Sequence, residues 1–256
     1  MSEPSSDPTL RFSDRVADYV RHRPAYPAAL VDHLRVHGHV RPDSVVADIG
    51  AGTGISSAPF LDAGCRVFAV EPNAEMREAA VRALGERAGF RAVDGRAEAT
   101  SLGDASVDLV SAAQAFHWFD GAAVRAEWRR ILRPDGVVAV YWNSRLLHGS
   151  AFVEGYERLL REFGTDYADV AERHQDDVTM LRWFGAGLLE HAEFANAQML
   201  DFEALRGRLL SSSYAPQAGH PRHAAMIAAL QALFDATARD GAVELPYRTR
   251  LFVGTP

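Results

Sequence analysis

The chain has 256 residues and a formal net charge of −7, and all 27 of its basic residues are arginine, so it contains no lysine. The missing amine excludes Schiff-base chemistry, a P-loop lysine and the Tyr-x-x-x-Lys dehydrogenases, because a guanidinium cannot replace it. The acidic balance argues against a nucleic-acid-binding protein. Cys65 is the single cysteine, which excludes an intrachain disulfide and a thiolate-rich metal site.

The composition, 48% hydrophobic and 24% charged, is typical of a globular protein with a sizeable core. The longest apolar run, residues 137–142, is far shorter than the roughly 20 residues of a membrane-spanning helix. Residues 1–9 lack the basic and apolar regions of a secretion signal. We therefore expect a cytoplasmic protein that is a monomer or homodimer, makes no membrane contact and folds as one elaborated domain.

From residue 45 onward, short apolar runs alternate with helical segments, which is typical of a parallel sheet covered by helices. Gly64 suits the left-handed cap of one helix, and Asn73 suits the N-cap of the next. The Arg-Pro-Asp-Gly run at 133–136 predicts a turn. The predicted strands cover residues 45–49, 66–70, 90–93, 107–112 and 137–142, and the predicted helices cover 56–63, 73–84 and 124–132.

The last hundred residues are less regular, and residues 165–190 show no clear period. Pro246 lies inside the last predicted strand, which favours a sheet edge or a bulge there because proline cannot donate to the ladder. In this region we predict helices at 152–163 and 224–239 and strands at 194–202 and 243–253.

The strongest chemical signal is the run Asp-Ile-Gly-Ala-Gly-Thr-Gly at 48–54, which follows a predicted strand and precedes a predicted helix. Its glycines allow a sharp turn and a close approach to a ligand, and the helix N-terminus offers free amides. Glu71 ends the second predicted strand, where a carboxylate can accept hydrogen bonds from both hydroxyls of a ribose. The pattern predicts a site for an adenosine cofactor.

The spacing of the glycines argues against a dinucleotide. In a Gly-x-Gly-x-x-Gly fingerprint the last position would be Ile55 or Ser57, and neither is glycine. Asp48 would repel a pyrophosphate, whereas it suits a ligand with an ammonium group, such as the amino-acid end of S-adenosylmethionine.

At this point the sequence resembles the class I S-adenosylmethionine-dependent methyltransferases, whose first motif is an acidic residue, x, Gly-x-Gly-x-Gly. Residues 67–73 resemble the second motif, 106–110 the strand-four signature, and 130–136 the segment around the fifth strand. The resemblance implies a Rossmann-like three-layer α/β sandwich with a seven-stranded, mostly parallel sheet whose last strand is antiparallel. It further implies an N-terminal helical cap or flap at 1–43, a cofactor-binding core at 44–143 and substrate-side helices and strands at 144–256.

More narrowly, residues 12–27 and 114–119 look like the type 11 small-molecule branch, which includes the trans-aconitate methyltransferases. The family often has Gly-Asp-Ala after strand three, where this chain has Gly-Arg-Ala-Glu at 95–98, so Ala97 or Glu98 takes the adenine contact. The resemblance assigns S-adenosylmethionine to Asp48, Gly50, Gly52, Gly54, Glu71, Pro72, Ala97, Glu98 and Gln114.

Methyl transfer depends on alignment, which contributes roughly 7–11 kcal/mol. The acceptor pocket is expected at the carboxyl ends of strands four and five. His117 is the candidate general base, with a purely structural role as its alternative; a carboxylate acceptor would need no base and would be held by arginines. The predicted acceptor-binding residues are Tyr19, Arg23, Tyr26, Trp118, Trp142, Asn143 and Arg145.

The sequence predicts no metal site. His220 and His223 have no nearby acid or cysteine, and His37 and His39 flank a glycine in what reads as a solvated loop.

The leading prediction is a small-molecule methyltransferase, with a carboxylate as one possible acceptor. The alternatives are a non-catalytic S-adenosylmethionine-binding protein and an NAD-dependent oxidoreductase. A nucleic-acid methyltransferase is disfavoured because residues 111–114 lack the Asn/Asp-Pro-Pro-aromatic motif.

Overall fold

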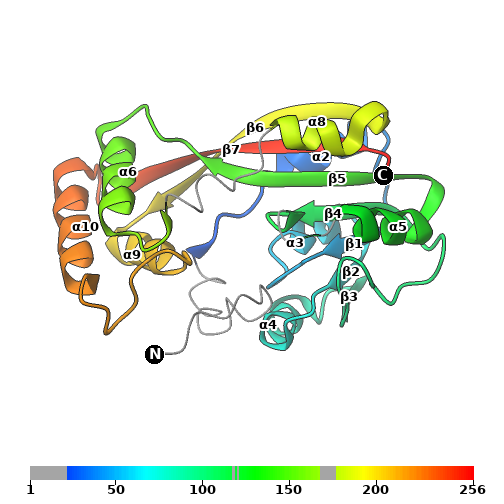
Figure 1. Cartoon of the computed structure of the whole chain (residues 1–256), viewed down its shortest axis with the longest axis horizontal. Coiled ribbons are helices and arrows are strands. Elements are labelled where there is room, and N and C mark those ends of the chain that lie inside the picture. Colours follow the sequence, from blue (N-terminus) through cyan, green and yellow to red (C-terminus); the bar gives the residue numbers. More distant parts are fainter. Residues whose placement is uncertain (1–21, 117–118, 120, 168–176) are drawn as a thin grey trace.

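A computed structural model of the chain describes residues 22–116, 119, 121–167 and 177–256. Its centre is a seven-stranded sheet of order β3-β2-β1-β4-β5-β7-β6 (Figure 1). Strands β1 to β5 run parallel to one another, and β7 is antiparallel to both β5 and β6, as the resemblance implied. The strands are β1 (Val45–Ile49), β2 (Arg66–Val70), β3 (Phe90–Val93), β4 (Val107–Ala113), β5 (Leu132–Arg145), β6 (Leu188–Leu200) and β7 (Val243–Gly254).

Helices cover both faces of the sheet, which confirms the three-layer sandwich. Successive side chains of a strand point to opposite faces, so Leu109 of β4 enters one core and Val110 enters the other. The first core is covered by α2 (Ala28–Val36), α3 (Ser57–Asp62) and α4 (Ala74–Leu84). The second is covered by α5 (Gly121–Ile131) and α8 (Asp177–Phe184), with Trp128 of α5 fully buried.

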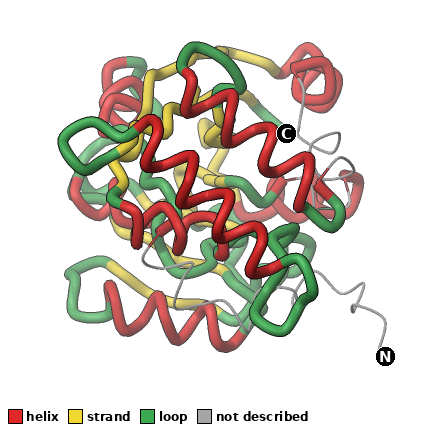
Figure 2. Tube along the Cα trace, turned by 90° about the vertical axis from the view of Figure 1, so that its left-hand side faces the viewer, coloured by secondary structure: helices red, strands yellow, loops and turns green. Residues whose placement is uncertain are grey.

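A third core lies where β6 and β7 extend beyond the other strands. Helices α6 (Ala151–Phe163), α9 (Phe202–Leu210) and α10 (His223–Thr237) pack there against Leu245 and Tyr247 of β7. Figure 2 looks onto this end of the molecule, where α6 and α10 cross the foreground in contact with each other. This core places α9 beside the carboxyl edge of the parallel strands.

The segment at 133–136 is not the predicted turn. Val107 pairs with Leu132 and Leu109 pairs with Val137, so the four residues between them bulge out of a strand that starts directly after α5. The Asp108 carboxylate closes the bulge: it accepts hydrogen bonds from the Val45 amide at 2.7 Å and from Arg133 at 2.6 Å. Buried residues pair with β4 on both sides of the bulge, and this pairing favours a strand that continues through the bulge over one that ends there.

Three further expectations are corrected in the C-terminal half. The sixth strand begins at Leu188 rather than 194, and part of the segment without a period forms α8. Strand β7 is not at the sheet edge, because it lies between β5 and β6. Pro246 is accommodated just past the end of β5. Its carbonyl accepts a hydrogen bond from the amide of Leu146, and its nitrogen, which has no hydrogen to donate, faces the same side. Among the described residues, no helix combines the length and the apolar character needed to cross a membrane.

The Asp108 contacts predict a pH-dependent contribution to stability. Partial burial acts to raise the pKa of Asp108, but the hydrogen bonds from Val45 and Arg133 lower it by more, so its pKa lies below the ordinary value. The stabilisation is therefore present above the unfolded pKa of about 3.9 and is lost as the pH falls through the folded value. We expect Asp108→Asn to lower the free energy of unfolding in urea by about 1–2 kcal/mol at neutral pH, and by less below about pH 4. The matched control is Asp135→Asn in the exposed bulge. If Asp108→Asn lowered the free energy of unfolding equally at every pH, the pH dependence would not come from the Asp108 carboxylate.

Candidate active site

A fully buried carboxylate lies beneath the glycine loop. Asp48, with 0% of its surface exposed, accepts hydrogen bonds from the hydroxyls of Ser57 at 2.6 Å, Ser56 at 2.7 Å and Ser111 at 3.1 Å. Burial raises the pKa of Asp48, and the three hydroxyls act against that rise. Its side chain does not reach the surface, and its hydrogen bonds hold the loop; the contact between Asp48 and a cofactor ammonium group stays a prediction.

The loop glycines differ in what surrounds them. Gly50 has φ +68°, and a Cβ there would lie 2.7 Å from the Cβ of Ala115. Gly52 has φ +56°, but a Cβ there would meet no atom within 4 Å. The first glycine is thus required by packing, whereas the second turns an open backbone face toward a pocket.

Glu71 joins the loop to the start of α4. Its Oε2 accepts from the Gly52 amide and its Oε1 from the Asn73 amide, both at 2.9 Å. Asn73 in turn caps α4 by accepting from the Met76 amide, as its residue type predicted. Burial raises the pKa of Glu71, and the two backbone hydrogen bonds oppose this. The carboxylate therefore lies against the loop backbone, next to where a cofactor would lie.

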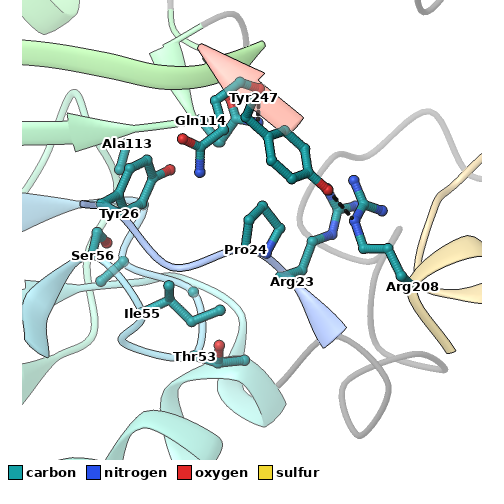
Figure 3. A pocket seen from close by; sticks show the side chains of 14 residues that line it. Arg23, Pro24, Tyr26, Thr53, Ile55, Ser56, Ala113, Gln114, Arg208 and Tyr247 are labelled. Atoms are coloured by element: carbon teal, nitrogen blue, oxygen red, sulfur yellow. Dashed lines mark hydrogen bonds between the residues drawn. The ribbon is translucent and has the colours of Figure 1, made fainter. Parts of the chain in front are cut away.

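A pocket of about 510 Å³, part of it open to solvent, lies at the carboxyl edge of β1, β4 and β5 (Figure 3). Its walls come from the glycine loop, the N-terminal segment, the strand ends, α9 and β7. The fourteen lining residues are Arg23, Pro24, Tyr26, Gly50, Ala51, Gly52, Thr53, Ile55, Ser56, Ala113, Gln114, Asn143, Arg208 and Tyr247.

Residues 22–27, which we call the strap, form one wall of this pocket. The Ala25 carbonyl accepts from the side-chain amides of Asn196 at 2.8 Å and Asn143 at 3.3 Å. Asn143 is itself oriented by the Thr249 hydroxyl, which donates to its Oδ1 at 2.6 Å. Asparagines on two separate strands therefore hold the strap in place.

The strap is also connected to the buried carboxylate. Tyr26 packs edge-on against Tyr141, with ring centroids 4.7 Å apart. The Tyr141 hydroxyl lies 2.9 Å from the Ser111 hydroxyl, which donates to Asp48. Burial raises the pKa of Tyr141 well above its ordinary value, so the phenol keeps its proton and can donate. One continuous set of contacts thus positions the strap and the glycine loop.

Six of the seventeen site residues predicted from the sequence line the pocket. Trp142 lies outside the pocket, because it points to the opposite face of the sheet and stacks on Phe252 with centroids 5.4 Å apart. Arg145 also lies outside, since Glu157 at 2.5 Å and Tyr167 at 2.8 Å hold its guanidinium. The predicted residues that line the pocket are Gly50, Gly52, Gln114, Arg23, Tyr26 and Asn143.

The remaining predicted residues fall into three groups. Glu98 is exposed, with its carboxylate 3.8 Å from Arg96, and Ala97 is buried in the core. Gly54 and Pro72 support the loop and the start of α4 without lining the pocket. Tyr19, His117 and Trp118 lie outside the described residues.

Sequence reasoning missed Arg208 and Tyr247. Arg208 lies between Leu205 and Leu209 on the apolar stripe of α9, and a charge in such a stripe was the available signal. Tyr247 belongs to the inward-facing series of β7 that includes Leu245. Only the packing of α9 over the sheet brings these two side chains together, with the Arg208 Nε 3.1 Å from the Tyr247 hydroxyl.

Comparison with known proteins gives the family. Residues 47–140 match the model of a methyltransferase domain. An uncharacterised methyltransferase of Mycobacterium tuberculosis is 33% identical over 248 residues, covering 95% of this chain and 94% of the relative. A solved structure from Anaeromyxobacter dehalogenans, assigned as a type II methyltransferase, superposes with a TM-score of 0.67 at 26% identity, covering 91% of this chain and 97% of that one. A protein of Saccharomyces cerevisiae assigned as S-adenosylmethionine-dependent is 31% identical over 132 residues, covering 49% of this chain and 44% of the relative.

The chain belongs to the class I S-adenosylmethionine-dependent methyltransferases. The pocket of this methyltransferase fits its cofactor on two observations. The Gly52 backbone faces open space, and the buried Thr53 hydroxyl has no hydrogen-bond partner within the described part of the chain. A polar atom without a partner in a pocket wall is a group that a ligand can satisfy.

Alanine substitutions at Gly50 and at Gly52 are expected to affect the methyltransferase differently. Gly52→Ala is expected to cost about 1–2 kcal/mol of stability, because only the backbone conformation is strained. The new methyl group enters the pocket, so the variant should fold and lose S-adenosylmethionine binding. Gly50→Ala adds a clash with Ala115 and should be clearly less stable. Thermal unfolding and calorimetry test both, and the opposite order of stability would contradict the packing argument.

If Glu71 binds the ribose as the sequence predicts, replacing it should lower the affinity for the cofactor. Glu71→Gln should raise the Kd of S-adenosylmethionine by roughly tenfold or more, because a hydrogen bond to a charged acceptor contributes about 1.5–3 kcal/mol. Glu75→Gln, on the exposed first turn of α4, is the matched control. An unchanged Kd in calorimetry would leave Glu71 with a structural role only.

Proposed function

We propose that this methyltransferase acts on a small-molecule acceptor that carries a carboxylate, and that it methylates a carboxylate oxygen. The observation that carries the proposal is the Arg208 guanidinium in the pocket wall. Arg208 is 7% exposed and donates to the hydroxyls of Tyr247 at 3.1 Å and Ser212 at 3.0 Å. Among the described residues, no carboxylate lies within ion-pair distance of it. A buried guanidinium with neutral partners favours an anionic ligand.

The whole pocket wall supports this preference. It contains two arginines and neither an aspartate nor a glutamate, although the chain as a whole carries a net charge of −7. Arg23 of the strap donates to the Ser211 carbonyl at 3.1 Å, next to the Ser212 that Arg208 contacts. In Figure 3 both guanidinium groups point toward the same end of the pocket, away from Thr53 and Ile55. The Arg208 guanidinium is thus placed to meet a carboxylate on a ligand in this pocket.

A carboxylate acceptor also suits the chemistry of the described site. When bound, S-adenosylmethionine supplies an electrophilic methyl group on a positively charged sulfur. A carboxylate is ionised near neutral pH and needs no general base. Arg208 and Tyr247 would bind and orient it, the strap would exclude water, and Asn143 would keep the strap in position. His117 remains the candidate base for acceptors that must lose a proton, and the cytoplasmic location remains a prediction.

An acceptor screen tests the proposal. Purified protein with S-adenosylmethionine is offered small carboxylic acids, their primary amides, phenols and amines, and S-adenosylhomocysteine formation is followed. We expect turnover with acids and none with the matching amides. Turnover confined to phenols or amines would contradict the proposal. Silence across the whole screen would favour the alternative of a non-catalytic cofactor-binding protein.

The position of Arg208 predicts that replacing it weakens binding of the acceptor but not binding of the cofactor. Arg208→Met keeps the apolar stem and removes the charge, so the acceptor KM should rise roughly tenfold or more while the Kd of S-adenosylmethionine stays within about twofold. Arg206→Met, an exposed arginine on the same helix that pairs with Glu203, is the matched control. If the variant instead loses S-adenosylmethionine binding, Arg208 serves the cofactor carboxylate.

A further inference from the structure

Three histidines and one carboxylate converge away from the pocket. His33 Nε2, His37 Nδ1 and His39 Nε2 lie 2.9, 2.6 and 2.9 Å from the carboxylate oxygens of Glu190. The histidines come from α2 and the loop after it, and Glu190 comes from the edge strand β6. The predicted loop at His37 and His39 is present, and His37 is exposed, but both rings also contact this carboxylate.

A β-bulge turns Glu190 toward the histidines. Leu188 pairs with Gly254, but Glu190 pairs with Val253, so Leu189 is an extra residue in the strand. In a regular strand, Glu190 would pair with Phe252 and share the face of Leu188, under α8, because side chains alternate along a strand. The bulge moves the carboxylate to the face that α2 covers. Bulges often re-aim side chains in this way at functional sites.

The helix α2 presents its histidines in matching order. His33 and His37 are four residues apart, so they lie one turn apart on the same face, and their ring centroids are 4.1 Å apart. Leu34 is buried in the core beneath the helix. Gly38, at φ +78°, ends the helix in the left-handed conformation and lets His39 turn back toward Glu190.

We propose that His33, His37 and Glu190 bind a divalent transition-metal ion, with Zn²⁺ as the best match. Two imidazole nitrogens and one carboxylate oxygen are a zinc-type donor set, and the i, i+4 spacing of a histidine in the last turn of α2 and a histidine at its C-cap is suitable. The ligand atoms of the three residues all lie within 4.8 Å of one another. Atoms about 2 Å from a tetrahedral ion are separated by roughly 3.4 Å, so small side-chain rotations suffice. His39 supports the carboxylate as an outer partner.

The ion would join α2 to the edge of the sheet. Glu190 pairs with Val253 of β7, which pairs with Ala139 of β5, whereas the pocket lies around Asn143, near the carboxyl end of β5. The residues of the metal site are therefore not among those that line the pocket. Its role would be structural: it would hold α2, and with it the strap that leads into α2, against β6.

Zinc titration of tag-free protein dialysed against a chelator tests the site. Calorimetry should show one Zn²⁺ bound per chain, and Zn²⁺ should raise the melting temperature. His33→Ala and Glu190→Gln should lose both effects, and His39→Ala should weaken binding roughly 10–100-fold. His148→Ala, which removes an exposed histidine elsewhere, is the matched control and should bind as the parent protein does.

Two results would overturn the proposal. One is no Zn²⁺ binding by the parent protein, which would leave a hydrogen-bonded histidine–glutamate cluster without metal. The other is equal Zn²⁺ affinity in the parent protein and Glu190→Gln, which would place the binding elsewhere. Circular dichroism confirms that each variant is folded, with the nearly isosteric Glu190→Gln as the decisive one. Zn²⁺ binding and the metal-dependent rise in melting temperature are measured without S-adenosylmethionine, so this test is independent of the active site.

Discussion

The buried carboxylate of Asp48 is the interaction on which the arrangement of this methyltransferase depends. An ionised carboxylate without solvent contact is costly unless hydrogen bonds satisfy it. Here three serine hydroxyls do so, two of them at the start of α3 and one, Ser111, on β4. The same contacts connect β1, the glycine loop and β4 at one point. The loop is therefore held in position by the carboxylate at its base, and its backbone is left to face the pocket.

The contacts that begin at Asp48 extend to the strap. Ser111 contacts Tyr141, Tyr141 packs against Tyr26, and Asn143, two residues farther along β5, holds the Ala25 carbonyl. Alternation along β5 explains why these two residues serve the pocket side while the intervening Trp142 packs into the opposite core. The wall of the pocket and its floor are thus parts of one hydrogen-bonded and packed structure, which limits how far the strap moves independently of the loop.

The charge of the pocket contrasts with that of the molecule. An acidic chain places two arginines and no acid in the wall of this pocket, and Arg208 has hydroxyl partners, whereas Arg145 outside the pocket is paired with Glu157. Arg208 keeps its charge in a buried place because guanidinium remains protonated, and hydroxyls rather than carboxylates satisfy it. The absence of lysine matters here, since arginine is then the permanent cation available for holding an anion in two-point contact.

The sequence alone determined the parallel sheet, the glycine loop and the cap at Asn73, because each depends on residues close together in the chain. It also indicated the methyltransferase family, since the motifs recur in order along β1 to β5. Only the tertiary structure decided which distant side chains meet: Arg208 with Tyr247, the strap with β5 and β6, and Glu190 with His33, 157 residues away. The reason is that side-chain direction depends on strand register and helix packing. A single extra residue, such as Leu189, reverses it without leaving a signal in the local pattern.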